Sequence, residues 1–248
     1  REVTAPWYWN MAPNRDLTVT PRWIEERGTQ LGLEHRYLSR RSKGLLQLEY
    51  LPDDDLTGKD RGLFTYRHHG GLGSGWRADV DLNHLSDREY FEDLGTSLSL
   101  TSRTHMERRA DLRYEGRHVD FLARAQGYQQ LFGTEPYQRL PQFLLDADAP
   151  FGPDWLDLGL QAEAVRFGHD IQVPTGNRLD LWPRVGLDFE EPGWFLRPAA
   201  SVRHTRYWLE DSPTGTELER TTPVFSVDTG LFFDRFTESY QQTLEPRL

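Results

Sequence analysis

Apolar and polar positions alternate along much of the chain. In residues 75–85 the sequence GWRADVDLNHL interleaves two sets of side chains, Trp76, Ala78, Val80 and Leu82 in the first and Arg77, Asp79, Asp81 and Asn83 in the second. Successive side chains of a β-strand point to opposite faces of a sheet, so this period of two separates an apolar face from a charged one. The stretch predicts a strand whose two faces have different surroundings.

The same alternation recurs in nine further stretches, which are residues 16–23, 30–37, 45–51, 63–68, 109–116, 118–126, 156–164, 178–189 and 222–236. Three less regular stretches, 97–104, 140–148 and 195–208, raise the expected total to roughly thirteen strands. Most are ~8 to 11 residues long, the length that crosses a bilayer at the usual barrel tilt. No 3.6-residue period interrupts them, and residues 86–95 are expected to form a polar loop. The pattern predicts an all-β, antiparallel, up-and-down chain.

The connections between these stretches alternate in length. Residues 115–118 and 190–194 are short turns, whereas 86–95, 168–177 and 209–222 are longer polar segments. Aromatic residues gather near strand ends, among them Trp7, Trp9, Trp23, Trp76, Trp155 and Trp194. Short turns at one rim, long loops at the other and an aromatic girdle are typical of outer-membrane β-barrels. Aromatic caps on a soluble sandwich or propeller are the alternative interpretation.

Composition narrows the function classes. The 248 residues carry 29 basic and 39 acidic side chains, a formal net charge of −10, and a nucleic-acid partner is not expected because such binding needs a basic footprint. The absence of cysteine excludes a disulfide or a thiolate zinc site within these residues. No stretch approaches the roughly 18 apolar residues of a transmembrane helix, but a membrane barrel needs only alternate apolar residues.

Candidate chemistry is sparse. His68 and His69 are adjacent on a predicted strand and should point to opposite faces, so they are not expected to bind one metal ion. The acidic residues 51–60 lack the EF-hand spacing and are interpreted as a solvated hairpin loop, and the glycines of 70–76 as a turn. We expect no catalytic, cofactor or metal site.

Pro21 interrupts a regular strand pattern. Proline cannot donate a ladder hydrogen bond, so its strand should be an edge or a weak seam. A proline tolerated beside a β-bulge is an equally good interpretation from this residue alone.

Several long stretches resemble the barrel domain of the LPS-assembly protein LptD (OstA/Imp) family. They are WYWNMAPNRDLTVTPRW (7–23), RGTQLGLEHRYL (27–38), LEYLPDD (48–54), WRADVDLNHLSDREYFEDLG (76–95) and YQQTLEPRL (240–248). They occur in order along nearly the whole chain, and the Ala12-Pro13-Asn14 and TLEPR motifs are unusual. The resemblance implies that residues 1–248 form a single domain, the N-terminal half of an outer-membrane barrel of a Gram-negative bacterium.

The resemblance also implies partners and a mechanism. Lipopolysaccharide would be the substrate, an LptE-type lipoprotein would plug the barrel, and a periplasmic bridge protein would deliver lipopolysaccharide through a jelly-roll that these residues lack. Outer-membrane lipids would surround the barrel. The implied function is a translocon, not an enzyme and without a cofactor, that inserts lipopolysaccharide into the outer leaflet between its first and last strands. A passive porin-like channel and a soluble sugar-binding β protein are the alternatives.

Alternation and resemblance together give the expected roles of individual residues. The first strand, residues 16–23, would line the lateral gate with Asp16, Thr18, Thr20, Pro21 and Arg22. The residues expected to face a water-filled lumen are Arg77, Asp79, Asp81, Asp111, Arg113, Asp180 and Arg184. The residues expected to face lipid are Val80, Leu82, Leu158, Leu160 and Leu181.

Overall fold

Nearly all of the described chain is antiparallel β-structure. The computed structural model describes residues 1–95, 104–134, 136–149, 152–171, 174–213 and 215–248. Its strands are β1 (Glu2–Thr4), β2 (Trp7–Ala12), β3 (Arg15–Ile24), β4 (Gly28–Leu38), β5 (Ser42–Asp54), β6 (Lys59–Gly73), β7 (Trp76–Leu85), β8 (His105–Glu115), β9 (Val119–Gln130), β10 (Gln138–Asp148), β11 (Leu156–Gly168), β12 (Thr175–Leu187), β13 (Phe189–Glu191), β14 (Trp194–Glu210), β15 (Glu217–Leu231), β16 (Phe233–Phe236) and β17 (Gln241–Leu244). One short helix, α1 (Tyr90–Leu94), follows β7.

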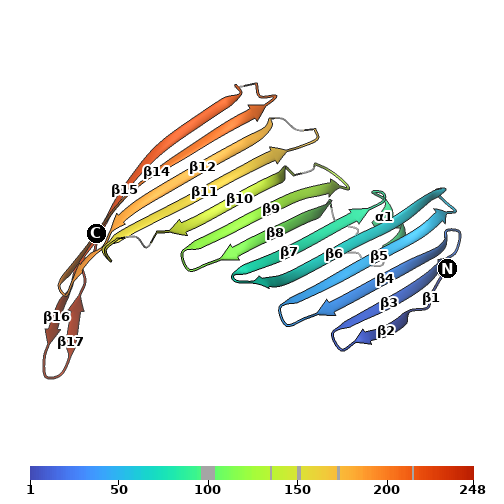
Figure 1. Cartoon of the computed structure of the whole chain (residues 1–248), viewed down its shortest axis with the longest axis horizontal. Coiled ribbons are helices and arrows are strands. Elements are labelled where there is room, and N and C mark those ends of the chain that lie inside the picture. Colours follow the sequence, from blue (N-terminus) through green and yellow to red (C-terminus); the bar gives the residue numbers. More distant parts are fainter. Residues whose placement is uncertain (96–103, 135, 150–151, 172–173, 214) are drawn as a thin grey trace. The chain divides into compact units, whose positions relative to one another are not determined.

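Fifteen of these strands form one sheet in which sequence neighbours pair from β3 to β12, and β14 pairs with β12, β13 and β15 (Figure 1). Strands β16 and β17 form a separate hairpin. This all-β, up-and-down order confirms the predicted fold class. Twelve of the strands have ten or more residues, close to the expected roughly thirteen, and the additional ones have only three to six. The strand predicted over residues 97–104 lies outside the described residues except for Thr104.

The chain divides into two compact units. The first unit contains Arg1–Tyr114, Ala123–Pro141 and Phe167–Ile171, and the second contains Glu115–Leu122, Gln142–Arg166 and Gln172–Leu248. In the first unit, short turns join β2 to β3, β4 to β5 and β6 to β7, whereas the segment from β7 to β8 is long. In the second unit a short turn joins β13 to β14 and a longer loop joins β14 to β15. Residues 25–27 and 55–58, which join β3 to β4 and β5 to β6 at the other rim, are also short turns, so the predicted alternation of short and long connections is present only in part.

The predicted first strand is not the edge of the sheet. Residues 16–23 lie in β3, which pairs with β4 on one side and with β1 and β2 on the other. The edge is made by β1 and β2, which are separated at Ala5 and Pro6. The sequence did not reveal them because β1 has three residues, and Trp7, Tyr8 and Trp9 in β2 show no alternation. The interruption falls opposite Pro21, whose carbonyl accepts from the Ala5 amide but whose nitrogen has no hydrogen to donate back.

The most deeply buried apolar side chains of the first unit gather around α1. They are Leu51, Leu85, Tyr90, Phe91, Leu94, Met106 and Leu131, with Ile24 and Leu63 packed against them. The expectation of a loop without a core-forming helix was wrong for Tyr90–Leu94. Five residues are too few for a helical period to stand out in the sequence, and the helix is stabilised by packing rather than by its length. Among the described residues, no helix has the length and apolar character required to cross a membrane.

The last residues of the chain begin another pairing in the second unit. The Thr229 amide donates to the Leu248 carbonyl at 3.0 Å, and the Leu248 amide donates back to Thr229 at 2.8 Å. Gly230 and Arg247 form an antiparallel β-bridge next to this pair of residues. Residues 246–248 thus lie beside β15 in the position of the next strand.

Candidate functional site

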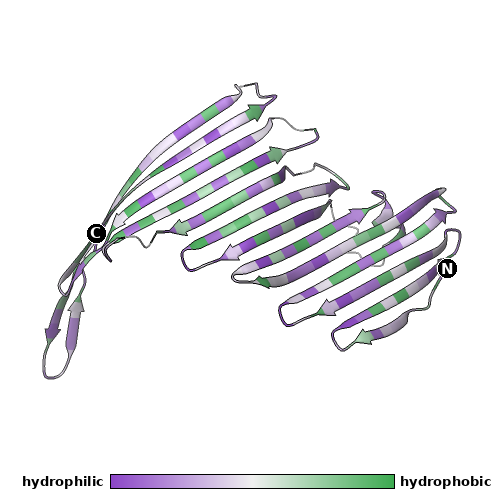
Figure 2. Cartoon of the chain, viewed as in Figure 1, coloured by the Kyte–Doolittle hydropathy of each residue, from purple (hydrophilic) through white to green (hydrophobic). Residues whose placement is uncertain are grey.

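One face of the first unit carries charged and polar side chains in every strand from β3 to β8. Figure 2 shows hydrophilic and hydrophobic residues alternating along these strands. The charged face includes Asp16, which accepts hydrogen bonds from Arg36 at 2.9 and 3.2 Å. One strand further, the Gln47 amide donates to Glu34 at 2.9 Å. These polar side chains are therefore bonded to neighbours on the next strand, as cross-strand pairing favours.

The network continues through the residues predicted to face a lumen. Asp79 is bonded to His69 and lies 3.8 Å from Arg113 Nε. Arg113 also donates to Asp111 at 3.0 Å, and Asp111 accepts two further bonds of 2.8 Å from Arg124. The structure therefore brings Asp79, Asp111 and Arg113 together.

Asp81 belongs to the same charged face. It accepts a hydrogen bond from the Asn83 amide at 2.8 Å and lies 3.6 Å from Arg67. Arg77 lies opposite Arg113 in the pairing of β7 with β8. All three residues predicted in β7 as lumen-facing thus share one side of the sheet.

The second unit repeats this arrangement. Asp180 on β12 is nearly buried, and it accepts bonds from Arg203 at 3.0 Å and from the Thr205 hydroxyl at 2.6 Å. Arg184, four residues along the strand, lies 3.8 Å from Asp148 and 3.7 Å from Asp157. The two charged residues predicted on β12 therefore contact polar and oppositely charged side chains of neighbouring strands and not solvent alone.

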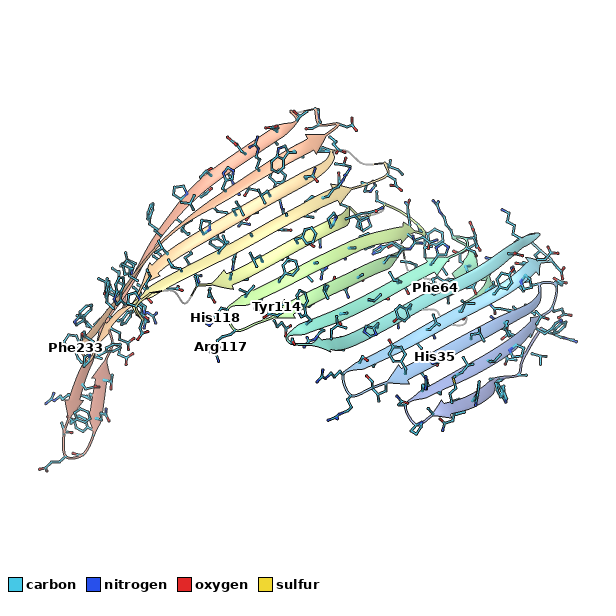
Figure 3. All side chains as sticks on the ribbon, viewed as in Figure 1. His35, Phe64, Tyr114, Arg117, His118 and Phe233 are labelled. Atoms are coloured by element: carbon cyan, nitrogen blue, oxygen red, sulfur yellow. The ribbon has the colours of Figure 1, made fainter. Side chains whose placement is uncertain are left out.

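The opposite face is mainly apolar and lies open. It carries the residues predicted to face lipid, and Leu160 has 37% of its surface exposed. Val80 stands opposite His68, and Leu82 opposite Tyr66, in the pairing of β6 with β7. Figure 3 shows His35 on β4 and Phe64 on β6 among the side chains of the first unit. Histidine and tyrosine therefore interrupt an otherwise hydrocarbon surface.

A buried charge cluster joins the strand ends to the segment that contains α1. Only 3% of the Arg61 side chain is exposed, and it donates to Asp87 at 2.6 and 3.0 Å, to Asp93 at 2.6 Å and to Asp54 at 3.2 Å. Asp54 is completely buried and also binds Arg27 at 2.8 Å. Residues 51–60 are thus not simply a solvated loop, as the sequence suggested, because Asp54 anchors them.

Two titratable groups of this segment have shifted pKa values. Burial opposes ionisation of Asp87, but hydrogen bonds from Arg61 and Ser86 hold the pKa of its carboxyl below the usual value. Burial raises the pKa of the Tyr90 phenol, and the Glu49 carboxylate raises it further. The phenol therefore stays protonated and donates to Glu49 at 2.6 Å while accepting from Gln30 at 2.8 Å. The α1 segment is fastened to β4, β5 and β6 by these bonds.

Arg22, predicted at the gate, connects α1 with the sheet edge. Its guanidinium donates to Glu2 on β1 at 3.0 Å and to the Leu94 carbonyl at 2.9 Å. Pro21 accepts a bond from the Ala5 amide at 3.1 Å through its carbonyl. In an extended residue the N–H and C=O positions face the same neighbour, so the missing donor of Pro21 faces the break between β1 and β2.

Sequence reasoning missed Arg61, Asp54 and Tyr90. Arg61 continues the period-two pattern of Thr65 and Arg67, which is a weak signal for its face. Nothing local showed its burial, because the covering helix begins 29 residues further along the chain.

The histidine pair behaves as its spacing predicts. His68 is bonded to Tyr37 and His69 to Asp79, on opposite sides of β6. Within the described ranges, no group of three or more histidine, aspartate or glutamate residues is arranged to hold a metal ion.

Comparisons with known proteins give a consistent match. A family model described as "LptD: LPS transport system D" matches residues 59–248. The "LPS-assembly protein LptD" of Nitrosococcus oceani is 44% identical over 99% of this chain and 35% of that protein. The protein of the same name from Alkalilimnicola ehrlichii is 42% identical over 100% of this chain and 34% of its own length. The chain thus spans about a third of the curated relatives it matches.

Among solved structures, a bacterial polysaccharide outer membrane secretin covers 98% of this chain and 86% of its own. Its identity is 10% and its TM-score 0.37, too low for any argument about fold or function.

Proposed function

The chain belongs to the LptD family of LPS-assembly proteins, and from this premise we propose that it forms part of an outer-membrane barrel that inserts lipopolysaccharide into the outer leaflet. Members of this family are outer-membrane proteins of Gram-negative bacteria, and the predicted location follows from that membership. The observation that carries the proposal is the bonded charged face opposite an open apolar face. A soluble sheet would have to hide the apolar face, whereas a barrel in a bilayer exposes it to lipid.

In this proposal the charged face lines a water-filled lumen. Arg77, Asp79 and Asp81 would face the lumen from β7, and Val80 and Leu82 would face lipid. The charges on this face support the orientation, because water in a lumen solvates them whereas contact with lipid hydrocarbon would be costly. The lumen would hold an LptE-type lipoprotein plug. A jelly-roll elsewhere in the full protein would receive lipopolysaccharide from the periplasmic bridge protein.

The lateral gate of this proposal lies at β1 and β2 together with β3. Pro21 has no amide hydrogen to donate where the edge is interrupted between β1 and β2, so we expect pairing to be locally weak there. Lipopolysaccharide would leave between this edge and the last strand of the full barrel. The bonds of Arg22 to Glu2 and Leu94 support a link between the edge and α1. Export needs no chemical step in this chain, and the energy must come from other parts of the transport system.

Substitution of Val80 tests the orientation. Val80 lies in the middle of β7, and V80R in the full-length protein should lower the free energy of unfolding by ~2 to 4 kcal/mol, since a cation near the bilayer midplane is poorly solvated. Refolding titrations in lipid vesicles measure this cost. Surface lipopolysaccharide should fall in proportion to the amount of folded barrel.

The matched control is the neighbouring D79N, which changes a charge on the other face of the same strand. It should retain nearly full stability and surface lipopolysaccharide. If V80R and D79N lowered the free energy of unfolding equally, the assignment of the two faces would be wrong. A larger loss in D79N would reverse the assignment.

A further inference from the structure

The short edge strand β1 is bonded to the charged face through the side chain of Glu2. Its backbone pairs with Arg22, Trp23 and Ile24 of β3. Packing adds little, because the Glu2 side chain is 53% exposed and Val3 is also exposed. Arg22 donates to the Glu2 carboxylate from Nε at 3.0 Å and from Nη2 at 2.5 Å. Two donors of one guanidinium therefore hold β1.

The same guanidinium is fixed on its other side by α1 and β4. Arg22 Nη1 donates to the Leu94 carbonyl at 2.9 Å and to the Gln30 side-chain oxygen at 3.3 Å. Leu94 is the last residue of α1, where a helix leaves carbonyls without intrahelical partners, and an arginine is a suitable donor for them. Only 14% of the Arg22 side chain is exposed. Arg22 therefore joins β1, β4 and α1 in one contact.

The carbonyl that Arg22 binds belongs to a well-anchored segment. The buried Tyr90 donates to Glu49 on β5 at 2.6 Å. Asp93 accepts from Arg61 on β6 at 2.6 Å, and the Leu94 side chain is buried in the cluster around α1. These contacts hold α1 on the ends of β5 and β6. The helix can therefore serve as a fixed support for the guanidinium.

The edge is interrupted directly after β1. Ala5 and Pro6 separate β1 from β2, and β2 has its own pairing with β3. At the interruption the Ala5 amide donates to the Pro21 carbonyl at 3.1 Å, but Pro21 has no N–H to return a bond. If the guanidinium released its carboxylate, β1 would be held mainly by its three backbone pairs with β3.

We propose that Arg22 is a clamp that keeps β1 closed, with α1 as its support. Opening would release Glu2 from Arg22 and turn β1 at Ala5 and Pro6, while β2 and β3 stay paired. Arg22 is in this respect a positioning residue, since it acts through β1. The inference rests on the lateral gate of the proposed function, and it names the contact that restrains that gate.

Amide hydrogen exchange tests the clamp in the full-length protein in lipid nanodiscs, with mass spectrometry of peptides that include residues 2–4. R22Q should make the β1 amides exchange roughly five- to thirtyfold faster, because it removes charged hydrogen bonds that are partly shielded from water. R22K keeps the charge, but one ammonium cannot replace the guanidinium at Glu2 and Leu94 together, so its effect should be intermediate. Amides of β4 and β5 should exchange at the wild-type rate in both variants, which shows that the sheet is folded.

Two further variants are the controls. R36Q removes an arginine that donates two bonds to Asp16 on the same face, and β1 should exchange in it at the wild-type rate. E2R/R22E restores opposite charges between β1 and β3, but a carboxylate cannot donate to the Leu94 carbonyl, so β1 should exchange about as fast as in R22Q. Wild-type exchange in R22Q, or equal acceleration in R36Q, would overturn the clamp. Wild-type exchange in E2R/R22E would overturn the role of α1 as its support.

Surface lipopolysaccharide in cells that express the same variants separates the clamp from the proposed function. Faster exchange of β1 in R22Q supports the clamp whether or not export changes. Unchanged exchange of β1 with altered export would overturn the clamp and leave the proposed transport function standing.

Discussion

A disulfide between β2 and the last strand of the full-length barrel should reduce surface lipopolysaccharide to near background, and a reducing agent should restore it. A lipid with several acyl chains cannot pass sideways through a covalently closed edge. Asn10 in β2 is a suitable position for one cysteine, because β2 pairs with β3 on one side and belongs to the free edge of the described sheet. Surface lipopolysaccharide in living cells is the readout.

Two controls separate gate closure from general damage. N10C alone should export normally. The pair E34C/Q47C places a disulfide between β4 and β5, whose side chains already bond at 2.9 Å, and should also leave export intact. Normal export by the crosslinked edge would contradict a lateral exit, and loss of export in E34C/Q47C would show that the disulfide acts through rigidity.

The second large effect is expected at Arg61. R61M should lower the free energy of unfolding by about 3 to 5 kcal/mol, because removing one partner leaves a buried charge uncompensated. Asp54 has no exposed surface, and Asp87 and Asp93 would lose their shared donor as well. Denaturant titration of the full-length protein in lipid vesicles measures this loss.

R36M is the matched control, since Arg36 also bonds an aspartate but has 53% of its side chain exposed. Exposed pairs contribute about 0.2 to 1 kcal/mol, so its effect should be several times smaller. Adding D87N to R61M should recover part of the stability, because Asp87 loses Arg61 whereas Asp54 and Asp93 keep Arg27. Similar losses in R61M and R36M would mean that the cluster is not the anchor of α1.

How much the sequence predicts depends on the range of the interactions involved. Alternation of apolar and polar residues predicted β7 at Trp76–Leu85, because successive side chains of a strand point to opposite faces of the sheet. The same rule predicted that Asp79 and Asp81 share one face and Val80 the other. It could not tell which face meets lipid, since alternation separates two faces but does not show what surrounds each of them.

Contacts between distant segments were not predictable from local pattern. In the sequence, Arg61 and Asp54 look like ordinary polar residues at a strand end. They are buried by α1, whose five residues are too few to show a helical period. The sheet edge was misplaced for a related reason. Pro21 led to the expectation of weak pairing, which stays a prediction, and β1 and β2 are too short and irregular to be recognised, so residues 16–23 were taken as the edge.

The central claim is that lipopolysaccharide passes along the charged face and leaves at the β1–β2 edge. Its most direct test is photo-crosslinking in living cells, with a photoreactive residue placed in turn at Asp81, at its neighbour Val80 and at Tyr8 in β2 of the full-length protein. Lipopolysaccharide adducts should form from Asp81 and from Tyr8 but not from Val80. Adducts from Asp81 without any from Tyr8 would contradict the lateral exit and favour a porin-like route, and adducts from Val80 without any from Asp81 would contradict the assignment of the two faces.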